Sequence, residues 1–162
     1  MHDVWVIEEL ATEPWVVALK PRVSDKGQIG RAAGTSDHQG IVAFTDFYPY
    51  SEVAEIVEAP GAIVVLDQIQ DPRNLGAVAR VVDGVGAAGI VIPRRGSPEV
   101  TGAVCKTSSG AIEHVRLAQV DNIASFLHDA KGGDRWVIGA DSEATEDFRE
   151  IGLDSSAILV CG

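Results

Sequence analysis

Four short apolar runs constrain the fold of this chain more than any other feature. They are AIVVLD (62–67), GIVIP (89–93), RWVIGA (135–140) and AILVCG (157–162). Runs of this length that are continuously apolar, rather than alternating, are typical of strands buried on both faces of a sheet. The sequence beyond residue 60 therefore predicts a sheet whose two faces are both covered.

Helical patterns lie between these strands. The first predicts a helix over 74–86, because apolar residues recur there at helical spacing, at Leu75, Val78, Val82 and Val85. The pattern over 121–131 predicts a second helix, behind a capping Asp121. The segment 98–108 is weakly helical, and 114–118 alternates like a strand.

Strands joined by helices of this length predict an α/β fold, with a mainly parallel, doubly wound sheet and helices on both faces. Ligands bind such sheets beyond the carboxyl ends of the strands. Those ends carry the segments 67–74, 93–95 and 139–142, and also Gly162. We therefore expect the functional residues in these segments.

Residues 1–59 follow a different pattern. Four elements are expected there: strands over 4–10 and 38–45, a helix over 24–34 behind Ser24, and a helix over 50–59 behind Ser51. This is too little chain for an independent core, so it predicts part of a small α+β domain and its linker. The main domain is expected over 60–162.

The composition predicts a packed globular protein, with 46% hydrophobic and 23% charged residues. The longest apolar run is far too short for a membrane span, and the N-terminus has acids where a signal peptide needs bases. These features predict a cytoplasmic protein with no membrane partner. Cys105 and Cys161 form neither a disulfide framework nor a CxxC motif, and no His/Cys/Asp cluster occurs, so we expect no metal.

The net charge of −11 argues at first against a nucleic-acid partner. The charge is uneven, however, because residues 73–116 hold six Lys or Arg and three Asp or Glu, a local charge of +3. A basic zone in an acidic protein can attract phosphate locally. Solvated charges with no partner produce the same pattern, so the charge alone leaves both interpretations open.

The stretch GVGAAG (84–89) matches the dinucleotide-binding pattern G-x-G-x-x-G. That fingerprint must follow a strand and open a helix, whereas this stretch closes a helix and precedes a strand. The glycines are better explained as the end of the helix and a tight passage into the next strand. A nicotinamide or flavin site is therefore not expected.

The stretch DPRNLGAVAR (71–80) has a more informative context, because it leads from a strand into a helix. Asn74 stands where a helix cap is expected, and Gly76 permits a close approach to the first turn. Arg80 lies roughly 240° round the helix from Asn74, off the apolar stripe, so the core does not require it. Taken alone, Asn74 could be only a cap, and Arg80 only half of a surface ion pair.

The segment LDQIQDPRNLGAVARVVDGVGAAGIVIP (66–93) resembles the first signature of the SpoU (TrmH-type) RNA ribose 2'-O-methyltransferases, in the SPOUT class of knotted methyltransferases. HQGIVA (38–43) is similar to the junction that ends the small N-terminal RNA-binding domain of that family. KTSSGAIEHV (106–115) resembles the segment after the second sheet strand. The resemblance covers residues 34–162 almost continuously.

The resemblance implies S-adenosyl-L-methionine as the cofactor, structured ribosomal or transfer RNA as the substrate, and a homodimer as the assembly. Asn74 and Arg80 match the asparagine and arginine of the first signature, which implies catalytic roles at the ribose. The family pattern also implies that the cofactor contacts Gly139, Ala140 and Gly162. The basic residues expected to contact RNA are Arg73, Arg94, Arg95 and Lys106.

An arginine is a poor general base, because its pKa exceeds about 12. We therefore expect Arg80 to bind the neighbouring phosphate and to polarise the 2'-hydroxyl, while the phosphate or water takes the proton. Alignment of the two reactants supplies about 7–11 kcal/mol in well-oriented reactions, so this chemistry needs no metal.

The sequence departs from the family pattern at its end. The glutamate of the second signature and the whole third signature, which complete the cofactor pocket, the knot and much of the dimer, do not follow Gly162. We therefore expect a truncated member of the family. This leaves a second interpretation open, in which the chain is catalytically incomplete and acts as an RNA-binding or dimerisation module.

Overall fold

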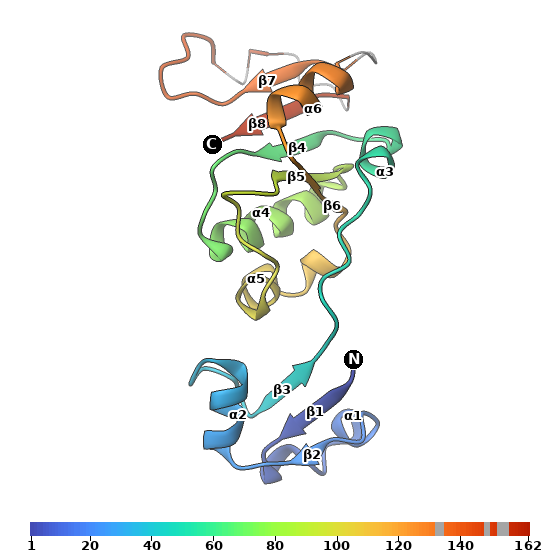
Figure 1. Ribbon diagram of the computed structural model, residues 1–162, viewed down its shortest axis with the longest axis vertical. Coiled ribbons are helices and arrows are strands. Elements are labelled where there is room, and N and C mark those ends of the chain that lie inside the picture. The colour runs from blue at the N-terminus through green and yellow to red at the C-terminus, as the bar shows by residue number, and fades with distance from the viewer. Residues whose placement is uncertain (132–134, 148–149, 152–155) are drawn as a thin grey trace. The chain divides into compact units, whose positions relative to one another are not determined.

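The computed structural model describes residues 1–131, 135–147, 150–151 and 156–162. The chain forms two compact units, unit 1 over 1–48 and unit 2 over 49–162 (Figure 1). The division falls before the helix predicted over 50–59 rather than after it, because that helix packs on the sheet of unit 2.

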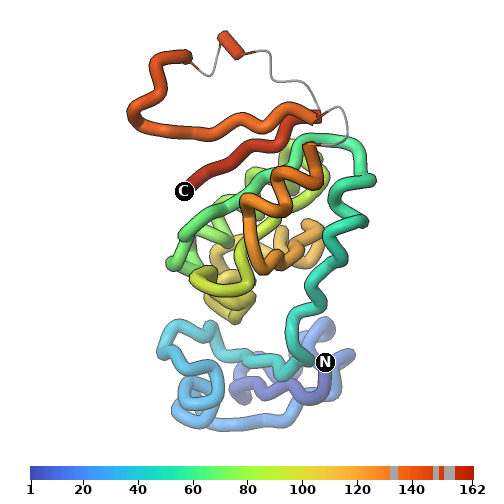
Figure 2. Tube along the Cα trace, turned by 45° about the horizontal axis from the view of Figure 1, so that its top comes forward, coloured from blue at the N-terminus to red at the C-terminus, as the bar shows by residue number. Residues whose placement is uncertain are grey.

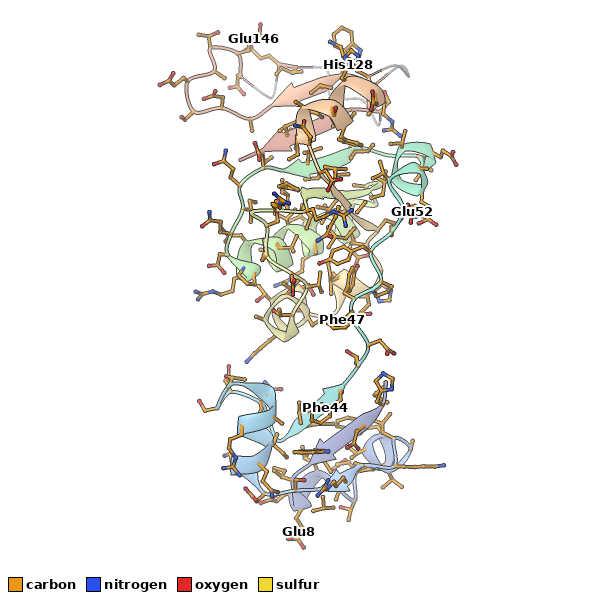
Figure 3. The ribbon with its side chains drawn as sticks, in the orientation of Figure 1. Glu8, Phe44, Phe47, Glu52, His128 and Glu146 are labelled. Carbon is orange, nitrogen blue, oxygen red and sulfur yellow. The ribbon has the colours of Figure 1, made fainter. Side chains whose placement is uncertain are left out.

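Unit 1 is a small α+β structure built on a three-stranded sheet of order β2-β1-β3. Its elements are β1 (Asp3–Val6), a 3-10 turn (Glu8–Leu10), α1 (Pro14–Val17), β2 (Arg22–Val23), α2 (Lys26–Ala33) and β3 (Ile41–Phe44). β1 pairs with β2 in parallel and with β3 in antiparallel orientation. The ring of Trp5 lies 5.0 Å from that of Phe44, which is labelled in Figure 3, and Arg22 stacks over Trp5 at 5.1 Å.

Unit 2 contains a five-stranded, fully parallel sheet of order β6-β5-β4-β8-β7. The strands are β4 (Ile63–Leu66), β5 (Gly89–Pro93), β6 (Leu117–Val120), β7 (Val137–Gly139) and β8 (Ile158–Cys161). The helices are α3 (Val53–Glu58), α4 (Pro72–Val85), α5 (Gly102–Ser108) and α6 (Ile123–Ala130), with a 3-10 turn at Ala111–Glu113. Figure 2 shows β7 and β8 side by side at one edge. The predicted α/β fold is confirmed.

Helices cover both faces of this sheet, as predicted. On one face, Ile56 of α3 and Phe126 of α6 pack in one core cluster with Ile63 and Val65 of β4. Because side chains alternate along a strand, Leu66 of β4 faces the other side, where α4 and α5 lie. Of the helices in the described ranges, none is long and apolar enough to cross a membrane.

Several element boundaries differ from the sequence predictions. The strand expected over 114–118 begins only at Leu117, because a 3-10 turn occupies Ala111–Glu113. Three helices are capped by a residue other than the expected one: Asp25 instead of Ser24, Asp71 instead of Asn74, and Asn122 instead of Asp121. The helix that follows Ser51 has no side-chain cap. Where two neighbouring residues can both cap, the sequence does not distinguish them.

Arg135 holds together the edge of the sheet opposite the carboxyl ends of the strands. Its guanidinium donates hydrogen bonds to the carbonyl oxygens of Gly61 (2.8 Å), Ala59 (2.9 Å) and Val57 (3.1 Å). These carbonyls lie at the end of α3 and just before β4, where backbone acceptors have no helical partner. Arg135, which precedes the edge strand β7, therefore links that strand to the segment between α3 and the central strand β4.

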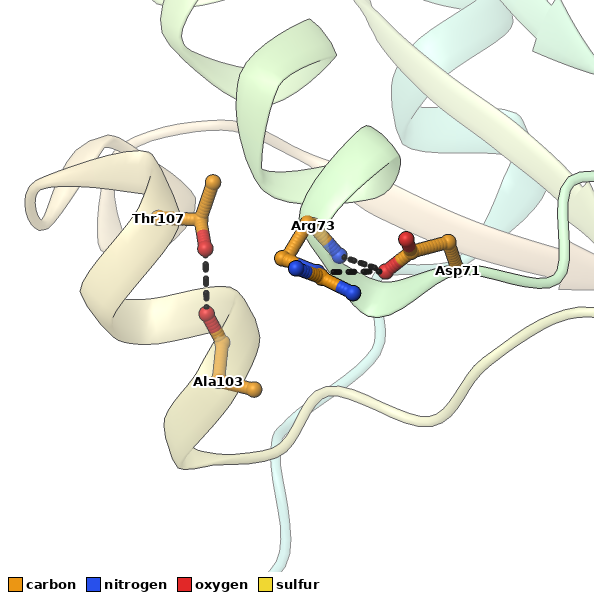
Figure 4. Close-up of polar contacts among 4 residues, drawn as sticks. All are labelled: Asp71, Arg73, Ala103 and Thr107. Atoms are coloured by element: carbon orange, nitrogen blue, oxygen red, sulfur yellow. Dashed lines mark hydrogen bonds and ion pairs between the residues drawn. The ribbon is translucent and has the colours of Figure 1, made fainter. Parts of the chain in front are cut away.

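The contact between α4 and α5 depends on Gly76. A Cβ atom at this position would lie 2.8 Å from Cβ of Thr107 and 3.0 Å from the backbone of Val104 and Ser108. Thr107 is held in place because its Oγ1 donates to the carbonyl of Ala103 at 2.8 Å (Figure 4). The sequence suggested a close approach at Gly76, and the approaching partner is α5 of the same chain.

This contact yields a stability prediction. Gly76→Ala should lower the free energy of unfolding by roughly 1–3 kcal/mol, because the added methyl group overpacks the two helices. Gly84→Ala is the matched control, since a Cβ there meets nothing within 4 Å. The control should raise stability by about 0.5–1 kcal/mol through helix propensity. Urea unfolding followed by circular dichroism measures both, and equal effects of the two variants would contradict the packing argument.

Candidate functional site

The order in which the chain forms its strands reverses direction beside β4, at the carboxyl edge of the sheet. The chain runs from the central β4 outward to β5 and β6, and then crosses to β7 and returns to β8 beside β4. Such a reversal of direction is where open parallel sheets bind ligands. At this point the amide of Asp67 donates to the carbonyl of Cys161 at 2.8 Å, and a Cβ on Gly162 would lie 3.3 Å from the carbonyl oxygen of Asp67.

The loop after β4 turns into α4 through Asp71. Its Oδ1 accepts a hydrogen bond from the amide of Arg73 at 2.8 Å and from Nε of Arg73 at 3.3 Å (Figure 4). The amide hydrogen bond, followed by the contact with the guanidinium, lowers the pKa of Asp71 below its usual value. Asp71 therefore caps the helix as a carboxylate.

Asn74 and Arg80 are both exposed on α4, and neither is part of the core. The alternative in which Asn74 serves only as the helix cap is excluded, because Asp71 is the capping residue and Asn74 lies in the first turn behind it. Arg80 lies six residues further on, about 9 Å along the axis at roughly 1.5 Å per residue. The two predicted catalytic residues lie on one helix, but Asn74 is not among the residues that line the pocket at Arg80.

Arg80 lines a shallow pocket between α4 and the turn after α5. The lining residues are Arg80, Asp83, Gly84, Ser108, Ser109, Gly110, Ala111 and His114. No hydrogen bond or ion pair of Arg80 occurs within the described ranges of the chain. Its guanidinium is therefore available to an anion at this pocket.

Two of the three predicted cofactor residues meet at a hollow beside the end of β7. Gly139 and Ala140 line it, together with residues 136–138, 141, 144–147, 151 and 159. Gly162 is not among the lining residues, and lies instead next to Asp67 at the end of β4. The hollow includes the carboxylates of Asp141, Glu146 and Asp147, of which Glu146 points away from the sheet in Figure 3.

The predicted RNA-contacting cations lie at the start of α4, after β5 and on α5, and all are exposed. Arg73 is paired with Asp71, and Nε of Arg94 lies 2.9 Å from Oδ1 of Asp121. Exposed ion pairs of this kind are weak and exchange readily for other anions. These pairs therefore leave Arg73 and Arg94 able to contact phosphate. Arg95 takes part in no salt bridge described for these ranges.

Sequence reasoning missed an exposed apolar strip on α4. Val85 belongs to the helical spacing from which α4 was predicted, but it is 72% exposed, and Val81 is 63% exposed. Together with the exposed Ala77 they form the strip Ala77/Val81/Val85, spaced four residues apart beside Arg80. The regular spacing was visible in the sequence, but the helix carries two apolar stripes, and only the structure shows which is buried.

The two thiols are not reactive groups of this site. Burial raises the pKa of both Cys105 and Cys161, with a further contribution from Glu113 at Cys105, so both are neutral. Within the described ranges, no group of His, Cys, Asp and Glu side chains has the arrangement of a metal site.

Comparison with known proteins identifies the family. A model of the SpoU rRNA Methylase family matches residues 61–162. The TrmH family protein YacO of Bacillus subtilis is 41% identical over 134 residues, which cover 79% of this chain and 54% of that protein. The chain thus spans about half the length of the curated relative.

Solved structures share the fold. The SpoU methyltransferase AviRb of Streptomyces viridochromogenes, in complex with AdoMet, superposes with a TM-score of 0.76 at 16% identity, over 98% of this chain and 64% of that one. A structure described as an RNA 2'-O ribose methyltransferase gives a TM-score of 0.69 at 20% identity, over 98% and 63%. The family match over the whole parallel sheet, with the first-signature residues exposed on α4, shows that this chain belongs to the SpoU rRNA methylase family.

Proposed function

We propose that this chain takes part in the S-adenosyl-L-methionine-dependent methylation of a ribose 2'-hydroxyl in structured ribosomal or transfer RNA, in the cytoplasm. Membership of the SpoU family and the 2'-O ribose methyltransferase among its structural neighbours support this reaction. The observation that carries the proposal is Arg80, a first-signature arginine that is exposed, has no role in the core and lines a pocket.

The acidic residues at the hollow beside the end of β7 suit the charge of the cofactor. S-adenosyl-L-methionine carries a cationic sulfonium and an ammonium, and it supplies the electrophilic methyl group. Asp141 and Asp147 among its lining residues provide the opposite charge, while Gly139 and Ala140 have small or no side chains beside the backbone. Opposite charges near a ligand strengthen its binding, most of all where water is excluded.

Arg80 acts on the RNA rather than on the methyl donor in this scheme. A guanidinium binds phosphate oxygens through two parallel hydrogen bonds, which fixes the orientation of the attached ribose. The same charge polarises the 2'-hydroxyl and favours loss of its proton to the phosphate or to water. Asn74, in the first turn of α4, lies where helix amides also favour an anion, and we assign it to the same strand of RNA.

The Ala77/Val81/Val85 strip supports a homodimer. Exposed apolar side chains at regular helical spacing are typical of a helix that packs on a partner. The strip lies beside Arg80 on α4, so a second copy bound there would border the Arg80 pocket. We propose that this face of α4 is the contact between two copies of the chain.

The catalytic role of Arg80 can be tested with two variants. Arg80→Ala should reduce methyl transfer about 10²–10³-fold, the range seen when one oriented charge-stabilising donor is lost. Its affinity for S-adenosyl-L-methionine, measured by calorimetry, should remain close to that of the wild type. Arg116→Ala removes the same charge from an exposed position outside the Arg80 pocket and should retain activity. Unchanged turnover in Arg80→Ala would remove Arg80 from the mechanism. If the wild-type chain binds no cofactor at millimolar concentration, the result would favour the second interpretation, in which the chain is an RNA-binding or dimerisation module.

The dimer can be tested independently of activity. Val81→Asp combined with Val85→Asp places charges on the strip and should convert a dimer into a monomer in analytical ultracentrifugation. Val17→Asp, at an apolar position in unit 1 that is 54% exposed, should leave the sedimenting mass unchanged. A wild-type chain that sediments as a monomer, or a double variant that remains dimeric, would contradict the assignment of this face.

A further inference from the structure

We propose that His114 is a second catalytic residue of the Arg80 pocket and receives the proton of the ribose 2'-hydroxyl during methyl transfer. Both residues line this pocket, and the side chain of His114 is exposed there. The inference rests on the proposed function and refines it, because His114 takes the place of phosphate or bulk water as the group that finally holds the proton.

The chain turns back after α5 and brings His114 beside α4. Ser109 and Gly110 both have left-handed backbone angles, with φ of 54° and 88°. The 3-10 turn Ala111–Glu113 follows and packs against α4. The amide of His114 donates to the carbonyl of Ala111 at 3.0 Å, so the turn holds the backbone of His114 while its side chain borders the pocket.

The imidazole of His114 has no structural partner. Its side chain takes part in no hydrogen bond or ion pair within the described ranges of the chain. The buried His38 differs, because its Nδ1 accepts from the amide of Gly40 at 3.0 Å, and His2 differs because it pairs with Asp46. Both ring nitrogens of His114 are therefore available to a ligand in the pocket.

An imidazole is the side-chain base best matched to proton transfer near neutral pH. In its neutral form one nitrogen carries a free electron pair, which accepts a proton from a hydroxyl directly or through one water. The other polar groups of the pocket are poorer acceptors. The guanidinium of Arg80 is already protonated, and carboxylates such as that of Asp83 are weaker bases than imidazole as a class. The hydroxyl of Ser108 donates to the carbonyl of Cys105 at 3.0 Å.

The methyl transfer balances with His114 as the proton acceptor. The 2'-oxygen forms a bond to the methyl carbon, while the bond from that carbon to sulfur breaks and its electron pair stays on sulfur. The O–H bond also breaks, its electron pair stays on oxygen, and the proton moves to the free nitrogen of His114. The carboxylate of Asp83, at the same pocket, offsets the charge that this proton adds. The imidazolium then returns the proton to water.

The role of His114 can be tested in the full chain with two single-residue variants. His114→Ala should slow methyl transfer to structured RNA about 10²-fold, within the range contributed by a positioned base. The assay follows a single turnover with RNA and cofactor both saturating, so that weaker binding does not affect the rate. His128→Ala is the matched control, because it removes an exposed histidine from α6, outside the pocket, and should retain activity (Figure 3). Both variants should keep the wild-type melting temperature, since both side chains are exposed.

Two further measurements separate proton transfer from a role in positioning. Added imidazole should raise the rate of His114→Ala about tenfold and leave the wild type and His128→Ala unchanged, because a free base can enter the vacated space. His114→Gln keeps a hydrogen-bonding side chain that cannot take up the proton. It should be as slow as His114→Ala.

An NMR titration tests the contact without relying on activity. An RNA hairpin is added to the full chain carrying isotope-labelled histidine, and the imidazole signals are followed. Those of His114 should shift on binding, whereas those of His128 should remain unchanged.

A wild-type rate in His114→Ala, full activity in His114→Gln, no response to imidazole, or imidazole signals of His114 that do not shift with RNA would each overturn the role of His114. None of these results affects the proposed methylation by unit 2, provided that the wild-type chain transfers methyl groups to RNA. A wild-type chain that transfers none would overturn the proposed function and the role of His114 together.

Discussion

The pairing of β4 with both β5 and β8 is the contact on which the rest of unit 2 depends. β4 is the central strand, and it pairs in parallel with a neighbour on each side. Since all five strands are parallel, their carboxyl ends meet at one edge, and α4 begins directly beyond the end of β4. The close packing of Gly76 on α5 then fixes the position of α4, and Arg80, one turn further along, lies beside the turn that follows α5.

The strands and helices of unit 2 could be predicted from the sequence because continuous apolar runs and helical spacing are local patterns. Residues 89–93 form a strand with the bounds predicted, and 62–67 contains β4. The predicted strand over 114–118 was displaced, because the alternation of HVRLA does not distinguish the non-regular chain at 114–116 from a strand that begins at Leu117. The caps were missed for a similar reason, since Asp71 and Asn74 can both close a helix and only the backbone shows which one does.

The candidate site was predicted in part. Arg80 was placed correctly off the buried stripe because helical geometry alone determines that angle. Gly139 and Ala140 share a hollow, whereas Gly162 lies beside Asp67, because the separation between two strand ends depends on strand order rather than on local sequence.

The central proposal is that unit 2 carries the site for methylation of a ribose 2'-hydroxyl in RNA. It is tested most directly by incubating structured RNA with the chain and S-adenosyl-L-methionine labelled on its methyl group, followed by mass spectrometry of the digested nucleosides. The account predicts label in 2'-O-methylated nucleosides. Label on a base, or RNA that remains unlabelled, would contradict it.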